Sequence, residues 1–131
     1  MSNERSNAMS IVVSDMGHAL EFWRACGLEV PDTPDAPHVD VQVGGGFRMM
    51  LDTEDTVRSF DPGWARPSGG HRVAVALECD DPAAVDATYA RVLDAGFDGH
   101  LEPFDAFWGQ RYAVVHDPDG TPVDLFAALP G

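Results

Sequence analysis

Short apolar stretches alternate with polar turns through the first half of the chain. Residues 10–13 are apolar and predict a strand, and apolar side chains at helical spacing over residues 18–26 predict a helix. After a proline-rich loop, residues 38–43 alternate between apolar and polar side chains, which predicts a half-buried strand. Three glycines then predict a hairpin turn into a returning strand at residues 47–52.

The second half repeats this order after a polar linker. Residues 73–79 alternate and predict a strand with its odd-numbered side chains on one face. Asp81 followed by Pro82 predicts the start of a helix, because Asp caps helices and proline is tolerated at the first helical position. An Asp-Pro-Asp-Gly sequence predicts a tight turn before the last strand. Three further strands are predicted, weakly within residues 101–108 and then at residues 112–116 and 122–127.

The two halves of the sequence can be aligned with each other. A shift of 66 residues carries Val13 to Cys79, and a shift of 74 residues carries Leu51 to Leu125. A period of this length, present twice, indicates a duplicated strand–helix–strand–strand–strand unit rather than a solenoid, which needs more repeats.

We therefore expect an α+β fold made of two tandem βαβββ modules, at about residues 9–60 and 71–129, within a single domain of residues 1–131. The curled mixed sheets would enclose a cleft and carry the helices on their outer faces. Residues 1–8 are expected to be a flexible N-terminus or the remnant of a tag.

The charge of the chain restricts the kinds of molecule that it is expected to bind. Eight basic residues, all of them arginine, stand against 22 acidic residues, for a net charge of −14. Without lysine, a Walker-type phosphate loop and Schiff-base catalysis are excluded. Without clustered cations, neither nucleic acid nor an anionic membrane surface is an expected partner. Two cysteines without metal-ligand spacing fit a cytoplasmic protein with free thiols.

Two stretches carry a resemblance to a known superfamily. Residues 15–28, DMGHALEFWRACGL, and residues 108–129, WGQRYAVVHDPDGTPVDLFAAL, resemble the glyoxalase / bleomycin-resistance / dioxygenase superfamily, also called vicinal oxygen chelate proteins. Together with the paired βαβββ units, the resemblance covers roughly residues 8–129. It implies the fold and a homodimer, but the superfamily ranges from lyases, isomerases, dioxygenases and thiol transferases to pure drug binders.

The resemblance also implies where a metal would be held. In metal-using members the ligands lie on the first and last strands of each unit, and the corresponding positions here are Ala8, Met50, Ala74 and Asp124. Alanine offers no donor, a thioether is a soft ligand, and one carboxylate binds a divalent ion weakly. His71 lies three residues before Ala74, on the other face of an ideal strand, and a one-residue slip of strand register would turn every other side chain of that strand as well, so it does not readily make His71 a metal ligand. His116 adjoins the turn and could reach the rim of the cleft. We therefore expect no metal and no cofactor.

The predicted cleft face supplies candidate ligand-binding residues. Asp124 interrupts an apolar run, so its carboxylate needs either a ligand or a structural partner such as Arg111 or Arg48. Trp108 and Trp64 lie beside glycines in loops, where each is a platform for a flat ligand, a cap on the core or a dimer contact. The predicted ligand-binding set is Asp40, Gln42, Met50, Trp64, Ala74, Glu78, Trp108, Tyr112, Asp124 and Phe126, and no catalytic residue is assigned.

Other members of this set have simpler explanations too. Ala74 and Ala76 would leave volume on the floor of the cleft, unless a bulky neighbour packs against them. Met50 would add an adaptable apolar wall. Asp40 and Gln42 suit the cleft, but an exposed sheet face would carry the same residues.

The favoured function is non-catalytic binding of a small organic molecule, such as a drug or antibiotic, as in the bleomycin-resistance type. The acidic field favours a cationic or polar organic ligand. The alternative is a metal-dependent lyase or dioxygenase of the same superfamily, which needs at least three donors converging on one point. A third hypothesis is a degenerate paralogue whose cleft is filled by its own side chains. Exposed sheet edges also favour a homodimer.

Overall fold

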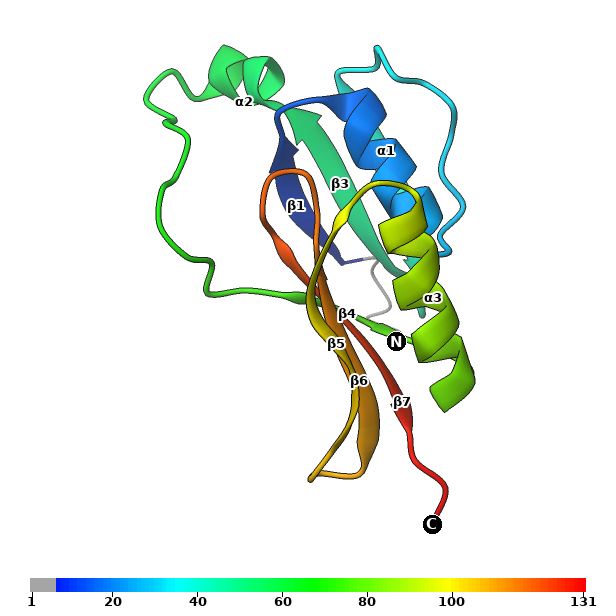
Figure 1. Ribbon diagram of the computed structural model, residues 1–131. Helices are drawn as coiled ribbons and strands as arrows, with labels where there is room; N and C mark the ends of the chain where they lie inside the picture. Colours follow the sequence, from blue (N-terminus) through cyan, green and yellow to red (C-terminus); the bar gives the residue numbers. More distant parts are fainter. Residues whose placement is uncertain (1–6) are drawn as a thin grey trace, which may run out of the picture. The chain divides into compact units, whose positions relative to one another are not determined.

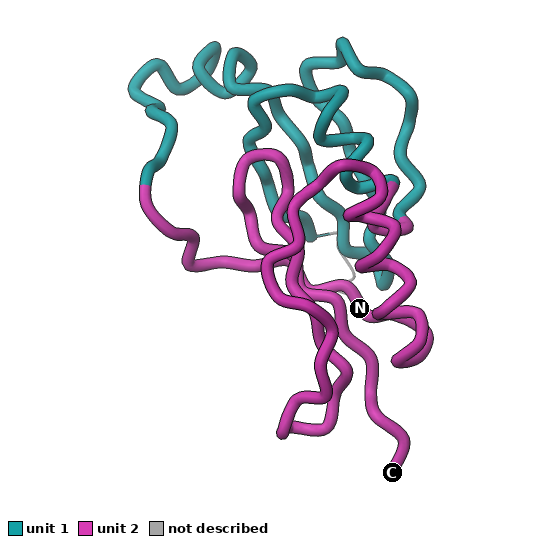
Figure 2. The backbone as a smooth tube through the Cα atoms, in the orientation of Figure 1, with its two compact units in different colours: residues 1–24, 28–68 teal, residues 25–27, 69–131 magenta. Residues whose placement is uncertain are grey.

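The computed structural model describes residues 7–131, which divide into two compact units (Figure 2). The first unit runs to Arg24 and resumes at Leu28–Ser68, and the second comprises Ala25–Gly27 and Gly69–Gly131. The α+β class is confirmed: the chain forms helices and two mixed sheets, one of three strands and one of four (Figure 1). That the two units act as one domain stays a prediction.

The first unit holds a three-stranded sheet. Its elements are β1 (Ala8–Val13), α1 (Met16–Ala25), β2 (His38–Gly44), β3 (Phe47–Thr53) and α2 (Glu54–Phe60). The strand order is β1-β3-β2, with β1 parallel and β2 antiparallel to β3. The buried side chains of these strands are all odd-numbered, among them Val13, Val41 and Leu51. Gly45 and Gly46 turn the β2–β3 hairpin with positive φ angles, which other residues rarely adopt.

The first sheet has one strand fewer than the repeat predicts. The chain between α1 and β2 carries Pro31, Pro34 and Pro37 and forms a loop. Proline has no N–H to donate and a fixed φ, so this stretch cannot contribute a strand to the ladder.

The segment after β3 was predicted as linker and instead begins with the short helix α2. The Thr53 hydroxyl caps it by accepting from the backbone N–H of Thr56 at 3.2 Å. Glu54 and Asp55 occupy its first turn, where the helix dipole favours acidic side chains. The cap and the charges were present in the sequence, so the linker prediction was wrong for residues 54–60.

The second unit holds the four-stranded sheet. Its elements are β4 (Val75–Glu78), α3 (Pro82–Asp94), β5 (Asp98–Ala106), β6 (Gln110–His116) and β7 (Pro122–Ala128). The strand order is β4-β7-β6-β5, in which only the β4–β7 pair is parallel.

Helix α3 covers one face of this sheet, packing on β5, β6 and β7. The odd-numbered residues of β4 and β7, with Ala113 and Val115 of β6, lie in the core, and Val115, Val123 and Leu125 are fully buried. Because side chains alternate along a strand, the even-numbered residues of β4, β6 and β7 point to the opposite face. We call this opposite face the open face.

The first strand of the second unit is shorter than predicted. It begins at Val75, so Ala74 precedes the strand, and Val73, which was predicted to be buried, is 58 % exposed. Its partner β7 begins at Pro122, and a proline has no N–H with which to extend the ladder toward residue 74. Ala76, rather than Ala74, is therefore the alanine paired with Asp124.

The Asp-Pro-Asp-Gly turn forms as predicted and joins β6 to β7. The buried Asp117 accepts hydrogen bonds through Oδ1 from the backbone N–H groups of Asp119, at 2.9 Å, and Thr121, at 2.7 Å. The N–H of Gly120, which has a positive φ, closes the turn onto the Asp117 carbonyl at 3.0 Å. The turn thereby fixes the register of the two strands that carry Tyr112 and Asp124.

Two remaining expectations concern the ends of the chain and membranes. Residues 1–6 of the predicted flexible N-terminus lie outside the described residues, and Ala8 opens strand β1. Within residues 7–131 no helix combines the length and the apolar character needed to cross a membrane.

Loss of the α3 cap should destabilise the second unit. The Asp81 carboxylate accepts from the backbone N–H of Ala84 at 2.8 Å, and Pro82 occupies the first helical turn. We expect Asp81→Ala to lower the free energy of unfolding by about 1 kcal/mol, measured by urea denaturation. Asp81→Ser should recover most of this loss. The neighbouring Asp80→Ala removes the same charge without removing a cap, and an equal loss there would contradict this explanation.

Candidate ligand-binding surface

The open face of the second sheet presents two adjacent rows of side chains. Strand register places Glu78, Phe126, Tyr112 and Phe104 side by side across β4, β7, β6 and β5. The neighbouring row runs Ala76, Asp124, Val114 and Leu101. One row thus carries a carboxylate followed by three aromatic rings, and the other carries a second carboxylate between an alanine and a valine.

A hydrogen bond links these two rows. The Tyr112 hydroxyl donates to Oδ2 of Asp124, and both side chains are half-buried. Burial, followed by the hydrogen bond to Asp124 and its negative charge, raises the pKa of Tyr112 to about 12. Tyr112 is therefore a neutral donor at physiological pH, and it holds the Asp124 carboxylate in one orientation.

The partner of Asp124 is Tyr112, and the two arginines considered as alternative structural partners make other contacts. Arg111 lies on the opposite face of β6 and donates to Asp86 of α3, at 3.0 Å from Nε, and to Asp105 of β5, at 3.0 Å from Nη1. Arg48 belongs to the first unit, where its Nε lies 3.7 Å from Asp40. Strand alternation decides the outcome, because an odd-numbered residue of β6 cannot reach the face that carries Asp124.

Aromatic rings surround Tyr112 on the open face. The centroids of Trp108 and Tyr112 are 5.3 Å apart and their planes meet edge to face at 79°. Phe104 lies 6.3 Å from each of these rings, and Phe126 lies 6.5 Å from Tyr112 with nearly parallel planes. We call Phe104, Trp108, Tyr112 and Phe126 the ring cluster. These separations are typical of favourable aromatic contacts.

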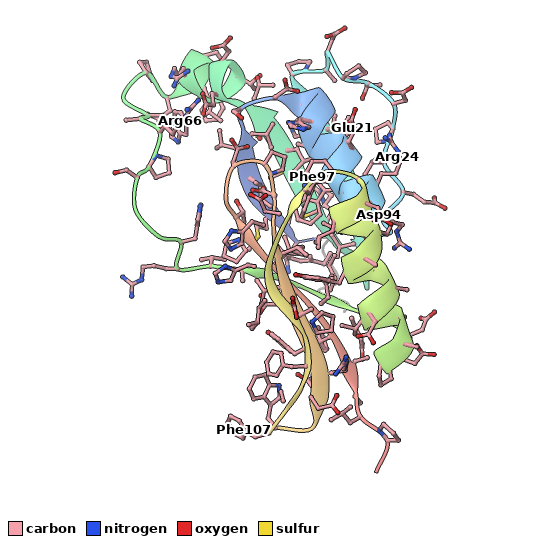
Figure 3. All side chains as sticks on the ribbon, viewed as in Figure 1. Glu21, Arg24, Arg66, Asp94, Phe97 and Phe107 are labelled. Atoms are coloured by element: carbon pink, nitrogen blue, oxygen red, sulfur yellow. The ribbon has the colours of Figure 1, made fainter. Side chains whose placement is uncertain are left out.

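The ring cluster is only partly covered. Trp108 is 49 % exposed although its Nε1 donates to Gln110 at 2.7 Å. Phe107 is 96 % exposed at the tip of the β5–β6 hairpin, where it is labelled in Figure 3. The cluster continues to Phe107, whose ring lies 5.0 Å from that of Trp108. A large aromatic surface therefore faces solvent.

Sequence reasoning selected three of the four residues of the ring cluster and missed Phe104. Trp108, Tyr112, Asp124, Phe126 and Glu78 were all in the predicted set and share the open face. Phe104 was not selected, because β5 has irregular register and a weak strand pattern. Pairing of Phe104 with Tyr112 across the hairpin was the available signal.

The first unit carries a separate polar cluster that the sequence analysis also missed. His38 lies between two carboxylates, with Nδ1 2.6 Å from Asp52 and Nε2 2.7 Å from Asp40. The hydrogen bond to Asp52, with that to Asp40 and both charges, raises the pKa of His38. The signal was present in the register, because His38 pairs with Asp52 and precedes Asp40 by two residues on the same side.

The other predicted residues belong to the first unit or, for Ala74, to the segment before β4. Gln42 is exposed beside Arg48, and Met50 is half-buried opposite Asp40 in the first sheet. Trp64 follows α2 and lies under the Arg58 guanidinium, which is 5.0 Å from the ring centroid. Ala74 is exposed ahead of β4.

The residues at the family's metal positions do not fit a divalent ion. The register differs from the predicted set at two positions: Asp124 pairs with Ala76 rather than with Ala74, and Met50 pairs with Ser10 rather than with Ala8. Neither pair offers more than one hard anionic ligand, whereas catalytic sites use three or more donors. Across residues 7–131, no three His, Cys, Asp or Glu side chains are grouped so that they could hold a metal ion.

Comparison with known proteins gives the class. Residues 5–125 match the model of the Glyoxalase/Bleomycin resistance protein/Dioxygenase superfamily, and the chain belongs to this superfamily. An uncharacterized protein of Mycobacterium bovis, Mb0911c, is 32 % identical over 118 residues, which cover 84 % of this chain and 74 % of that protein. Rv0887c of Mycobacterium tuberculosis, also uncharacterized, has the same identity, and the match spans 66 % of its length.

Solved structures share the fold. A glyoxalase/bleomycin resistance protein/dioxygenase from Nocardioides is 25 % identical with a TM-score of 0.74, and the match covers 100 % of this chain and 87 % of that one. The hypothetical protein SA1046 from S. aureus is 20 % identical with a TM-score of 0.79, covering 98 % of this chain and 95 % of that one. These likenesses show the fold, the family model shows the superfamily, and the superfamily hosts several chemistries.

Replacing Asp124 should release the Tyr112 phenol. In a Tyr89→Phe background, which leaves Tyr112 as the single tyrosine, Asp124→Asn should lower its pKa from about 12. The pKa should stay above the usual value of about 10, because burial remains. Tyrosinate absorbance during a pH titration measures both values.

The same pKa predicts how stability depends on pH. The folded-state pKa of Tyr112 is raised, so its contribution to stability is complete below pH about 10 and is lost as the pH rises through about 12. Asp124→Asn should reduce this alkaline loss. An unchanged Tyr112 pKa in the variant would contradict the role given to Asp124.

Proposed function

We propose that this chain is a small-molecule binding protein without a resident metal, and that it holds an organic ligand against the open face of the second sheet. One observation carries the proposal. The half-exposed Trp108 ring belongs to the same cluster as Tyr112, whose hydroxyl fixes the Asp124 carboxylate. Ligand sites typically combine apolar and aromatic walls with a few oriented polar groups.

The composition of this surface supports binding of a drug-like molecule. Phe104, Trp108 and Phe126 supply flat apolar area, and Asp124 supplies an oriented acceptor. The superfamily's name includes the bleomycin-resistance proteins, so a binding role has a precedent in the family.

The alternative, a metal-dependent lyase or dioxygenase, is less well supported. It requires at least three donors around one ion, and the corresponding positions of this chain carry alanine or serine, methionine and one aspartate. The chemistry of the donor set therefore favours ligand binding.

Binding can be tested with a panel of small aromatic compounds in neutral, cationic and anionic forms. We expect at least one member to shift the NMR signal of the Trp108 indole N–H, with the same affinity before and after treatment with a chelator. In the Trp108→Ala variant, binding is followed by the backbone amide shifts of β6 and β7, and it should weaken about tenfold, since loss of aromatic contact area is worth on the order of 1.4 kcal/mol. Trp64→Ala removes an equivalent ring from the first unit and should leave the affinity unchanged.

Two outcomes would overturn the proposed function. The first is that no panel member perturbs Trp108. The second is that binding or turnover appears only when a divalent metal ion is added.

We further propose that the chain forms a homodimer. Phe107 and Trp108, whose rings lie 5.0 Å apart, are exposed in the second unit, and exposed large apolar surface of this kind marks interaction sites. The second sheet also ends in β5, a nine-residue edge strand with most of its side chains exposed. Long exposed edges are templates for pairing with another chain.

The proposed homodimer can be tested by replacing Phe107, the exposed side chain at the tip of the β5–β6 hairpin. Phe107→Ser should weaken self-association by about tenfold, because it removes a large apolar side chain from the interface. Phe60→Ser is the matched control, since Phe60 is 72 % exposed in the first unit. Sedimentation equilibrium of both variants measures the effect. A monomeric parent chain at micromolar concentration would refute the homodimer.

A further inference from the structure

The open face brings two carboxylates together over an alanine. Ala76 and Glu78 lie two residues apart on β4, and Asp124 pairs with Ala76 while Phe126 pairs with Glu78. Glu78 and Asp124 are therefore diagonal neighbours on the same face, a separation of roughly 7 Å between their Cβ atoms. Ala76 is exposed and carries only a methyl group, so it leaves open space beside the two carboxylates.

No arginine of the sheet neutralises this pair, and His116, the histidine on the same face of β6, stacks on His100 with ring centroids 4.4 Å apart. Arg111 is the only arginine in the four strands, and it lies on the opposite face with Asp86 and Asp105. The hydrogen-bond partner of Asp124 is the neutral Tyr112 hydroxyl, which occupies Oδ2 and leaves the charge of the carboxylate in place. The open face therefore has a local negative charge within a chain whose net charge is −14.

The ring cluster borders the same carboxylates. Phe126 is the cross-strand neighbour of Glu78 and lies two residues from Asp124, and Tyr112 reaches Asp124 directly. The face of an aromatic ring attracts cations, and this attraction adds to that of a nearby carboxylate. Organic cations benefit from both, because their alkyl or aromatic parts are weakly hydrated and can also bury apolar area on the rings.

We propose that the ligand of the open face is a small organic cation: a quaternary or protonated amine attached to a flat apolar group. Its cationic group lies between Asp124 and Glu78 above Ala76, and its apolar part lies against Phe126, Tyr112 and Trp108. This inference rests on the proposed function and narrows it to one class of ligand. Two carboxylates without a third donor hold a metal ion poorly, whereas the adjacent rings favour an organic cation over a hydrated one.

A pair of probes of equal shape tests the charge requirement. Para-hydroxyphenyltrimethylammonium and para-tert-butylphenol differ in one atom, which is a cationic nitrogen in the first and a neutral carbon in the second. At mildly acidic pH, where both phenols keep their protons, we expect the cation to bind about tenfold more tightly, measured from the NMR shifts of the Trp108 indole.

Three variants with the same change in net charge locate the cation. Asp124→Asn and Glu78→Gln should each weaken binding of the cation by about fivefold and leave the neutral probe within about twofold. Asp94→Asn, at the exposed end of α3, should change neither affinity. Glu78→Gln keeps the test decisive if Asp124→Asn disturbs the Tyr112 contact.

The outcomes separate this inference from the proposed function. If the neutral probe binds as tightly as the cation, or if Asp94→Asn matches the other two variants, the cation site is refuted while small-molecule binding survives. If neither probe binds and no compound of the aromatic panel perturbs Trp108, both proposals fail together.

Discussion

The hydrogen bond from Tyr112 to Asp124 joins the two central strands of the second sheet on the face that α3 leaves uncovered. A half-buried carboxylate must find a partner, and the nature of that partner decides what the surface can bind. An arginine partner would have neutralised the charge of Asp124, and the carboxylate would no longer attract a cationic ligand. The tyrosine hydroxyl satisfies one oxygen while the negative charge remains, and its ring adds to the aromatic area around it.

Much of this arrangement could be predicted from alternation alone. The odd-numbered residues of β7 form the core and its even-numbered residues form the open face, and the Asp117–Gly120 turn fixes how β6 meets β7. The partner of Asp124 could not be predicted in the same way, because it is a diagonal contact that depends on strand register. Phe104 was not predicted for a similar reason, because two irregularities in the register of β5 interrupt the alternation of its side chains. His38 and its two carboxylates also required the pairing of β2 with β3.

Where the two units differ, short local sequence features explain the structure better than the repeat does. The three prolines between α1 and β2 remove a strand that the second unit has in the equivalent place, and the Thr53 cap starts a helix where only a linker was expected. The superfamily fold persists through these differences. At the strand positions where metal-using members are expected to hold their ligands, this chain carries alanine, serine, methionine and a single aspartate. The fold is therefore a scaffold in which the side chains of the open face specify the function.

The most direct test of this account is a crystal structure of the full chain with para-hydroxyphenyltrimethylammonium bound. The account predicts electron density for the probe on the second sheet, with its trimethylammonium group near Asp124 and Glu78 and its ring against Phe126 or Trp108. Density for the probe at another surface with the open face empty, or a metal ion held by three protein ligands, would contradict it.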